Sequence, residues 1–164
     1  MKEKNGIVTL EQTNEYNGSG QRIRKSENGI TINYYYQDGV ELYTTDGTGK
    51  KTSFNLMGAS KNVIATERYS DTEGSSTFIY NKDVRTSTTS IIDSNGQGVV
   101  GYTYDDYGKT EALGNVGSYN EICYTGGIYD HSTGLYYLNA RYYNPEDGRF
   151  ITRRQTKGQQ VSIK

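Results

Sequence analysis

The chain has one cysteine, one proline and one histidine among its 164 residues, and it has no tryptophan. The single Cys123 excludes an internal disulfide framework and a zinc site built on several cysteines. No apolar run approaches the roughly 18 residues of a membrane span, and no signal peptide is visible at the start. Disulfides, metal clusters and membrane helices are therefore excluded as the basis of the fold.

Hydrophobic residues make up only 32% of the chain, whereas there are 17 tyrosines and 20 glycines. A disordered chain of this polarity would be poor in aromatic residues, and this one is 12% aromatic. Tyrosine rings must then supply much of the buried surface, with each hydroxyl finding a partner. Short strands joined by glycine turns fit this composition, so we predict an all-β fold made of an antiparallel hairpin meander.

The net charge of −1 argues against a general partner of nucleic acids or membrane surfaces. Residues 153–164 carry four basic residues and no acidic one, so this tail has a charge of +4 and the rest has −5. We expect a solvated, disordered terminus. Contact with an anionic polymer is the alternative for this tail.

Turn signals recur along residues 1–110. Asn28-Gly29 and Asp38-Gly39 each separate two strand-like runs, which is the pattern of a two-residue hairpin turn. Other turns are expected at similar intervals, with an imperfect period of about 20 residues, as in a degenerate repeat array. The glycines that mark the array are Gly20, Gly39, Gly74, Gly96 and Gly108. Residues 54–59 fit either a strand or a short helix. Residues 111–114 and 118–122 are expected in a connecting loop, with one helical turn as an alternative.

Residues 129–150 are the most distinctive part of the sequence. Thr133-Gly134 predicts a tight turn, and residues 135–143 contain no glycine or proline, which predicts one strand of nine residues. Alternation along that strand would place Tyr136 and Tyr142 on the same face. Residues 144–148 then predict a second turn, and a further strand would begin at Arg149.

This segment resembles the core motif of the RHS/YD-repeat proteins over roughly 25 residues. The positions that carry the resemblance are Tyr129, Asp130, Thr133, Gly134, Leu135, Tyr136, Tyr137, Ala140, Arg141, Tyr142, Tyr143, Pro145, Gly148, Arg149 and Phe150. Upstream, residues 102–109 resemble the YD repeat of the same family through Tyr104, Asp105 and Gly108. The resemblance implies that the meander is part of a spiralling β-sheet shell, and that these residues have structural roles.

Members of that family are secreted or lie at the cell surface, and their shell encloses a C-terminal toxin. Many cut themselves after the core motif with aspartates in a motif that resembles Asp-Pro-x-Gly. The only proline here is Pro145, and it follows Asn144, so no catalytic role is carried over. The sequence shows neither that motif nor a toxin segment after the core motif.

The sequence offers few residues for catalysis or metal binding. His131 is the only histidine, so a thiol hydrolase would need Cys123 and His131 together; a buried thiol and an exposed turn histidine are the simpler interpretation. The carboxylate pairs 105–106 and 146–147 could bind Ca²⁺ weakly, but turns are usually acidic, and this is the simpler interpretation. We therefore predict no enzyme activity, no cofactor and no metal site.

The expected organisation is repeat strands over residues 1–110, a connector with the core motif over 111–152, and the basic tail over 153–164. The leading hypothesis is a non-catalytic structural fragment of an RHS/YD-repeat shell. Its partners would be the remainder of that shell or a toxin domain, with self-association through open sheet edges as a further expectation. The alternative is a module that binds surface or wall carbohydrate, since tyrosine-rich strand faces suit stacking against sugar rings.

Overall fold

The computed structural model describes residues 2–4, 7–9, 12–115, 120–138, 141–152 and 160–163, with backbone only for the first two of these segments and the last. Nearly all of the regular structure is antiparallel β. The strands are β1 (Lys2–Lys4), β2 (Ile7–Thr9), β3 (Gln12–Tyr16), β4 (Arg22–Glu27), β5 (Ile30–Gln37), β6 (Val40–Asp46), β7 (Lys51–Met57), β8 (Val63–Ser70), β9 (Gly74–Lys82), β10 (Thr88–Asp93), β11 (Gly98–Tyr104), β12 (Thr110–Gly114), β13 (Ile128–Asp130), β14 (Leu135–Leu138), β15 (Arg141–Asn144), β16 (Arg149–Phe150) and β17 (Gln160–Ile163).

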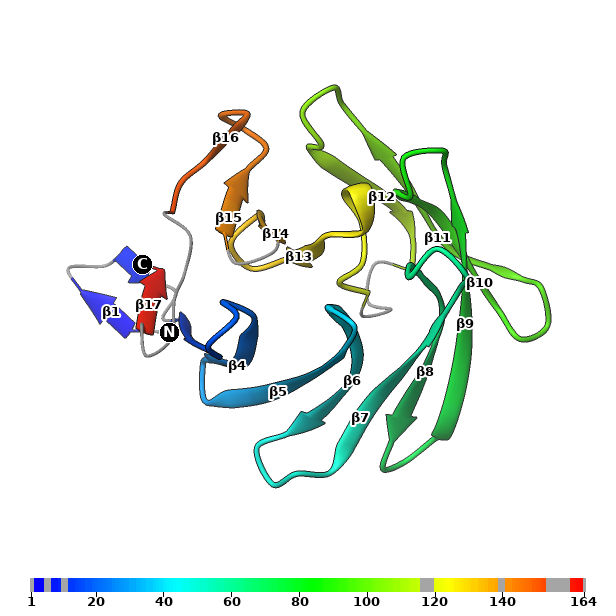
Figure 1. Ribbon diagram of the computed structural model, residues 1–164, viewed down its shortest axis with the longest axis horizontal. Coiled ribbons are helices and arrows are strands. Elements are labelled where there is room, and N and C mark those ends of the chain that lie inside the picture. Colours follow the sequence, from blue (N-terminus) through cyan, green and yellow to red (C-terminus); the bar gives the residue numbers. More distant parts are fainter. Residues whose placement is uncertain are drawn as a thin grey trace.

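One large sheet, which we call the repeat sheet, holds β3 to β12 in sequence order, with β17 added beside β3. The core motif forms a separate four-stranded sheet in the order β13-β14-β15-β16, which we call the core-motif sheet. Figure 1 shows the repeat sheet curving around the core-motif sheet, which lies on its concave side. The predicted all-β meander is confirmed.

Bulges explain why the repeat sheet curves. Six of the nine pairings between consecutive strands from β3 to β12 contain a register shift. A bulge places two residues of one strand opposite a single residue of its neighbour, which bends the strand and increases its twist. Repeated along the meander, these bends roll the sheet instead of leaving it flat.

Five turns of the meander, which lie at both ends of its strands, share a single design. In the turn that begins at Asp105, the carboxylate accepts hydrogen bonds from the N–H groups of Tyr107 and Lys109, both at 2.9 Å. Gly108 takes a φ of +87° at the fourth position, which a side chain would strain. The same two hydrogen bonds and a positive φ recur in the turns that begin at Asn17, Asp46, Asp83 and Asp93. The aspartate of the YD repeat is therefore a turn cap.

The β4–β5 and β5–β6 hairpins use two-residue turns instead. Asn28 and Gly29 both have positive φ, of 50° and 82°, and Asp38 and Gly39 repeat this at 51° and 85°. Positive φ at both central positions is the geometry that matches the twist of the flanking strands. The hairpins predicted at these two sites are confirmed.

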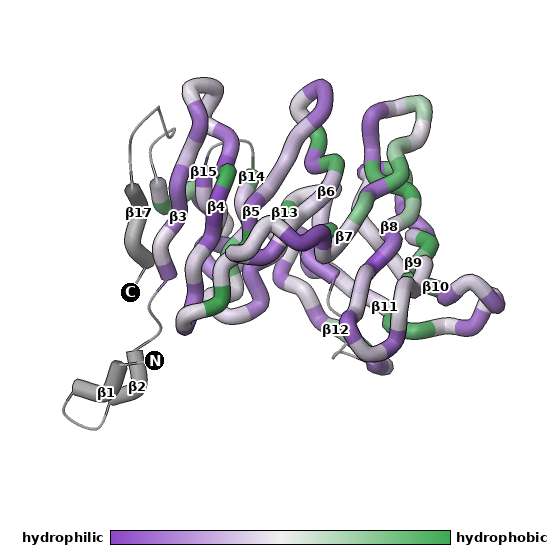
Figure 2. The backbone as a smooth tube through the Cα atoms, turned by 90° about the horizontal axis from the view of Figure 1, so that it is seen from below, coloured by the Kyte–Doolittle hydropathy of each residue, from purple (hydrophilic) through white to green (hydrophobic). Residues whose placement is uncertain are grey.

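Apolar residues are thinly spread along the chain, as the hydropathy colouring of Figure 2 shows. One buried cluster combines residues of β8 to β11 with Ile122, Cys123 and Tyr136. A smaller one holds Tyr16 with four residues of the core-motif sheet, Ile128, Leu135, Tyr137 and Tyr142. Both clusters join the two sheets, so the contact between the sheets is also the hydrophobic core.

Three expectations are corrected by the structure. Residues 135–143 are not one strand, because Leu138 pairs with Arg141 and Tyr137 with Tyr142, so the chain reverses between β14 and β15. The reversal pairs the tyrosines with one another, and it puts Tyr142 on the face of Tyr137 and not on that of Tyr136. Residues 111–114 belong to strand β12 and not to a loop, since β11 offers them a full ladder.

The third correction concerns residues 160–163 of the tail, where disorder was expected; residues 153–159 and 164 lie outside the described part of the chain. Residues 160–163 form β17, which pairs with β3 because that edge offers backbone hydrogen bonds. The ambiguous stretch near residue 54 is the strand β7 as far as Met57. Within the described residues, no helix has the length and apolar content needed to cross a membrane.

Candidate functional site: the seam between the two sheets

A cluster of charged and tyrosine side chains fills the contact between the repeat sheet and the core-motif sheet. We call it the seam cluster, and its members are Arg22, Lys25, Tyr34, Glu121, Asp130, Tyr137 and Tyr142. Arg22 and Asp130 are both fully buried, and their closest contact is 2.9 Å. Lys25 lies 3.1 Å from Asp130 and 2.9 Å from Glu121. Two cations thus face two anions at this site.

A bulge in β4 allows both cations to point inward. Tyr16 pairs with Arg22 and Glu15 pairs with Arg24, which leaves Ile23 as an extra residue. Arg22 and Lys25 are three residues apart, so in a regular strand they would lie on opposite faces. The extra residue restores the alternation after Arg22 and aims both side chains at the core-motif sheet.

Asp130 is the aspartate of a Tyr-Asp pair, but its side chain does not cap its turn. The backbone oxygen of Asp130 accepts hydrogen bonds from the N–H groups of Thr133 and Gly134, at 3.1 and 2.9 Å. Its carboxylate is turned inward to Arg22 and Lys25. The same residue type therefore caps turns in the repeats and supplies a buried anion in the core motif.

Tyrosines complete the surroundings of Arg22. Its guanidinium donates to the hydroxyl oxygens of Tyr34 at 3.2 Å and Tyr142 at 3.1 Å. It also lies 4.6 Å from the ring centroid of Tyr34 and 5.0 Å from that of Tyr137, within the range of cation–π attraction. The Tyr137 hydroxyl accepts from the Arg22 backbone N–H at 2.7 Å and donates to the Gly20 oxygen at 2.8 Å.

Two opposed effects set the pKa values of the seam cluster: burial disfavours charged side chains, and pairing with opposite charges favours them. Burial is the largest single influence on Arg22 and disfavours its charged form, but Asp130, together with Tyr34, Tyr142 and Glu121, outweighs it and raises the pKa of Arg22 well above its ordinary value. Burial also raises the pKa of Tyr34 well above 10, so that hydroxyl stays protonated. The Arg22 guanidinium and the Tyr34 hydroxyl therefore both keep their protons at neutral pH.

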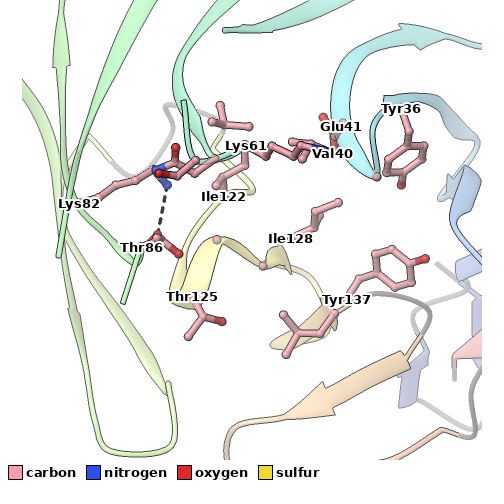
Figure 3. Close-up of a pocket in the computed structure, with 17 residues that line it drawn as sticks. Tyr36, Val40, Glu41, Lys61, Lys82, Thr86, Ile122, Thr125, Ile128 and Tyr137 are labelled. Carbon is pink, nitrogen blue, oxygen red and sulfur yellow. Dashed lines mark hydrogen bonds between the residues drawn. The ribbon is translucent and has the colours of Figure 1, made fainter. Parts of the chain in front are cut away.

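A cavity of about 270 Å³ lies beside the seam, between the β5–β6 hairpin and the segment that leads into β13. Figure 3 shows Val40, Ile122 and Ile128 on its walls, with Glu41 and Lys61 along one side. One oxygen of Glu41, Oε2, is buried and has no hydrogen-bond partner. Burial, reinforced by the nearby Glu121 carboxylate, raises the pKa of Glu41 to about 7.

The candidate catalytic residues do not form a reactive pair. Cys123 is fully buried, and burial raises the pKa of its thiol to about 12. Both residues contact Asn120: its side-chain Nδ2 lies 3.7 Å from the Cys123 sulfur, and its backbone oxygen lies 2.6 Å from His131 Nε2. A thiol of this pKa is a poor nucleophile. In the part of the chain that the structure describes, no group of three or more His, Cys, Asp and Glu side chains has the geometry to hold a metal ion.

Most motif residues predicted from the sequence lie in the seam or next to it. Tyr129 packs against Tyr136 with ring centroids 4.8 Å apart, and Tyr136 hydrogen-bonds with Thr110 of β12. Leu135 and Pro145 are buried, and Thr133 and Gly134 make the predicted turn.

The last part of the motif forms a more exposed arrangement. Arg141 lies over the Phe150 ring at 3.8 Å, and the Tyr143 hydroxyl donates to the Tyr107 oxygen at 2.7 Å. Gly148 has a φ of +63° and sits against the Tyr107 ring, and Arg149 is exposed. Ala140 lies outside the described residues.

The YD-repeat residues predicted from the sequence lie at the turn between β11 and β12. The Tyr104 hydroxyl donates to the Thr88 oxygen at 2.5 Å, which ties β11 to β10. Asp105 caps the turn, and the Tyr124 ring packs where a side chain on Gly108 would stand.

Sequence reasoning missed Arg22, Lys25 and Glu121. The local pattern of residues 22–25 predicts an ordinary alternating strand, and no signal in the sequence marks the bulge that turns two of them inward. Glu121 lies in a segment that was expected to be a connecting loop, and it is 6% exposed.

Comparison with known proteins decides the family. No family model matches the chain. The tRNA3(Ser)-specific nuclease WapA of Bacillus spizizenii is 38% identical to it over 146 residues, which is 85% of this chain and 6% of that protein. The tRNA nuclease WapA of Bacillus subtilis strain 168 matches with the same identity and coverage. The crystal structure of TcdB2-TccC3 superposes with a TM-score of 0.67 at 25% identity, over 91% of this chain and 8% of that one.

The chain belongs to the RHS/YD-repeat family. The resemblance carried by the core motif and the YD repeat is thereby confirmed, together with the fold that it implied. The chain spans only 6% of the length of its curated RHS/YD-repeat relatives. The nuclease activity in their names is therefore a property of those whole proteins.

Proposed function

We propose that this chain is a non-catalytic wall segment of an RHS/YD-repeat shell that encloses and delivers a toxin. In this proposal the core-motif sheet closes the shell from within, by docking on the concave side of the repeat sheet. The observation that carries the proposal is the fully buried ion pair of Arg22 and Asp130, which joins the two sheets. A charge pair without contact to water serves to hold one arrangement of the sheets.

The state of Cys123 and His131, the two residues that a thiol hydrolase would need, supports the same proposal. The thiol of Cys123 is buried and protonated at neutral pH, and His131 is bonded to a backbone oxygen. The Tyr-Asp and Gly positions of the motifs serve turns and packing. A protein wall needs these features, whereas a hydrolase needs an accessible nucleophile beside a base.

A chimera tests the proposal. The matching 146-residue segment of Bacillus subtilis WapA is replaced by residues of this chain, and resistance to limited proteolysis is compared with that of the parent. We expect equal resistance and retained tRNA nuclease activity. Asp130→Asn in the chimera should open the seam to protease, whereas Glu15→Gln, which alters an exposed ion pair with Arg24, should not. Unchanged resistance of the Asp130→Asn chimera would contradict the role given to the seam.

Carbohydrate binding at a cell surface or wall is the second candidate. Tyr35 and Tyr43 stack with centroids 4.3 Å apart on the face of the repeat sheet that points away from Tyr34, and Tyr35 is 41% exposed. Exposed aromatic rings on a strand face suit sugar stacking. A glycan array should then show binding that Tyr35→Ala abolishes and that Ser75→Ala, an exposed change on β9, leaves intact. Silence of the array at high protein concentration would end this candidate.

A further inference from the structure

The outer edge of β3 is held by a strand from the far end of the chain. Gln160 of β17 pairs with Glu15, and the register continues to Ile163 opposite Gln12. All the other pairings of the repeat sheet join consecutive strands, from β3–β4 to β11–β12. The preceding strand, β2, pairs with β1 in a separate two-stranded sheet, so β17 takes the place beside β3 that the sequence order would give to a further repeat strand.

β3 itself has the features of an interior strand. Natural edge strands are protected by lysines, prolines, bulges or inward-pointing charges. β3 (Gln12–Tyr16) has no lysine or proline, and its inward side chains Gln12 and Asn14 are neutral and 0% exposed. The one bulge beside it is on β4, where Ile23 is the extra residue.

The inward amides of β3 leave one hydrogen-bonding position open. Gln12 donates to Glu27 at 2.9 Å, and Asn14 donates to Gln12 at 3.0 Å. The Oδ1 atom of Asn14 is buried and has no hydrogen-bond partner. A buried acceptor without a donor is costly, so this position favours a neighbouring strand that carries one.

We infer that the outer edge of β3 is a docking site for a repeat strand of a second RHS/YD-repeat polypeptide, and that β17 is the exchangeable strand that occupies it. The inference rests on the proposed function and adds a partner to it. The incoming strand would pair in antiparallel register and bring an amide or hydroxyl donor opposite Asn14. A basic side chain opposite Glu15, on the outer face, would add a favourable cross-strand pair.

The directions of the backbone N–H groups identify which hydrogen bonds break when β17 leaves β3. The Asn17 N–H donates to the Gln21 oxygen within the β3–β4 hairpin. Because alternate residues of an antiparallel strand bond to opposite neighbours, Asn14 bonds toward β17 and meets Val161. By the same alternation the N–H of Ser162 points away from β3. Val161→Pro therefore removes a bond to β3, whereas Ser162→Pro is a matched control that removes none.

The experiment uses the full chain and Bacillus subtilis WapA shortened to end just before its matching segment. Each variant is mixed with this shortened relative, and affinity is measured by analytical ultracentrifugation. We expect Val161→Pro to bind at least tenfold more tightly than Ser162→Pro, with faster hydrogen exchange at the Asn14 amide before mixing. Equal affinities of the two variants in spite of faster exchange would overturn the inference.

A second variant and a fusion keep the two proposals separate. The chain ending at Thr152 lacks β17 and should bind at least as tightly as Val161→Pro, even where the proline variant folds poorly. In the fusion, the full chain is joined covalently to the shortened relative. A protease-resistant fusion with no binding in trans by any variant overturns the inference alone. A protease-sensitive fusion counts against the wall segment itself.

Discussion

The Asp130 carboxylate accepts hydrogen bonds from the guanidinium of Arg22 at 2.9 and 3.2 Å, although 108 residues separate them in the sequence. One partner lies at the bulge of a repeat hairpin, and the other is in the core motif. Both side chains are without exposed surface. The pair fixes where the core-motif sheet docks, because any other register of the two sheets would bury one charge without its partner.

Asp130→Asn should destabilise the protein by about 3–5 kcal/mol, since it leaves two buried cations, Arg22 and Lys25, short of one anion. Urea denaturation followed by circular dichroism measures this change. In the double variant Arg22→Met, Asp130→Leu the loss should be smaller than the sum of the two single losses. Additive losses would mean that the two side chains do not depend on each other.

The sequence predicts the parts of the fold that depend on local backbone chemistry. The turns at Asn28-Gly29 and Thr133-Gly134 follow from residues that accept positive φ or cap a turn. The bulge at Ile23 and the reversal after Leu138 depend on contacts between distant strands, which no local pattern encodes. The core motif could therefore be found from the sequence, while its partners in the seam could not.

The carboxyl group of Glu41 should make stability depend on pH. Burial raises its pKa from 4.5 to about 7 in the folded protein. Between pH 4.5 and pH 7 the folded state keeps the Glu41 proton that the unfolded state has already released. The contribution of Glu41 to the free energy of unfolding is therefore present in full below pH 4.5 and is lost as the pH rises through 7. Glu41→Gln should therefore gain stability relative to the parent between pH 5 and pH 8, by up to about 3 kcal/mol. Chemical denaturation at both pH values measures the gain.

The control for this prediction is Glu73→Gln, which alters an exposed carboxylate. Its stability relative to the parent should not change between the two pH values. An equal response of both variants would mean that Glu41 is in contact with water and titrates normally.

The thiol of Cys123 should not react in the native protein. Burial raises its pKa to about 12, so almost no thiolate is present at pH 8, and the side chain is fully covered. Labelling with an aromatic disulfide reagent should be complete only after denaturation. Ser75→Cys, at an exposed position of β9, adds a thiol that should react at once. Rapid native labelling of the parent would show that the core between the sheets opens readily.

Gly127→Ala tests how closely the segment before β13 approaches the core-motif sheet. Gly127 has an ordinary φ of −71°, so backbone strain does not enter. A Cβ at this position would collide with the Leu138 side chain and lie 3.2 Å from a ring carbon of Tyr136. Overpacking of this kind costs about 1–3 kcal/mol. Gly98→Ala is the control, because its Cβ would meet nothing within 4 Å. In the double variant Gly127→Ala, Leu138→Ala, part of the stability lost through Gly127→Ala should be recovered. A double variant that is less stable than Gly127→Ala alone would mean that the added methyl group does not collide with Leu138.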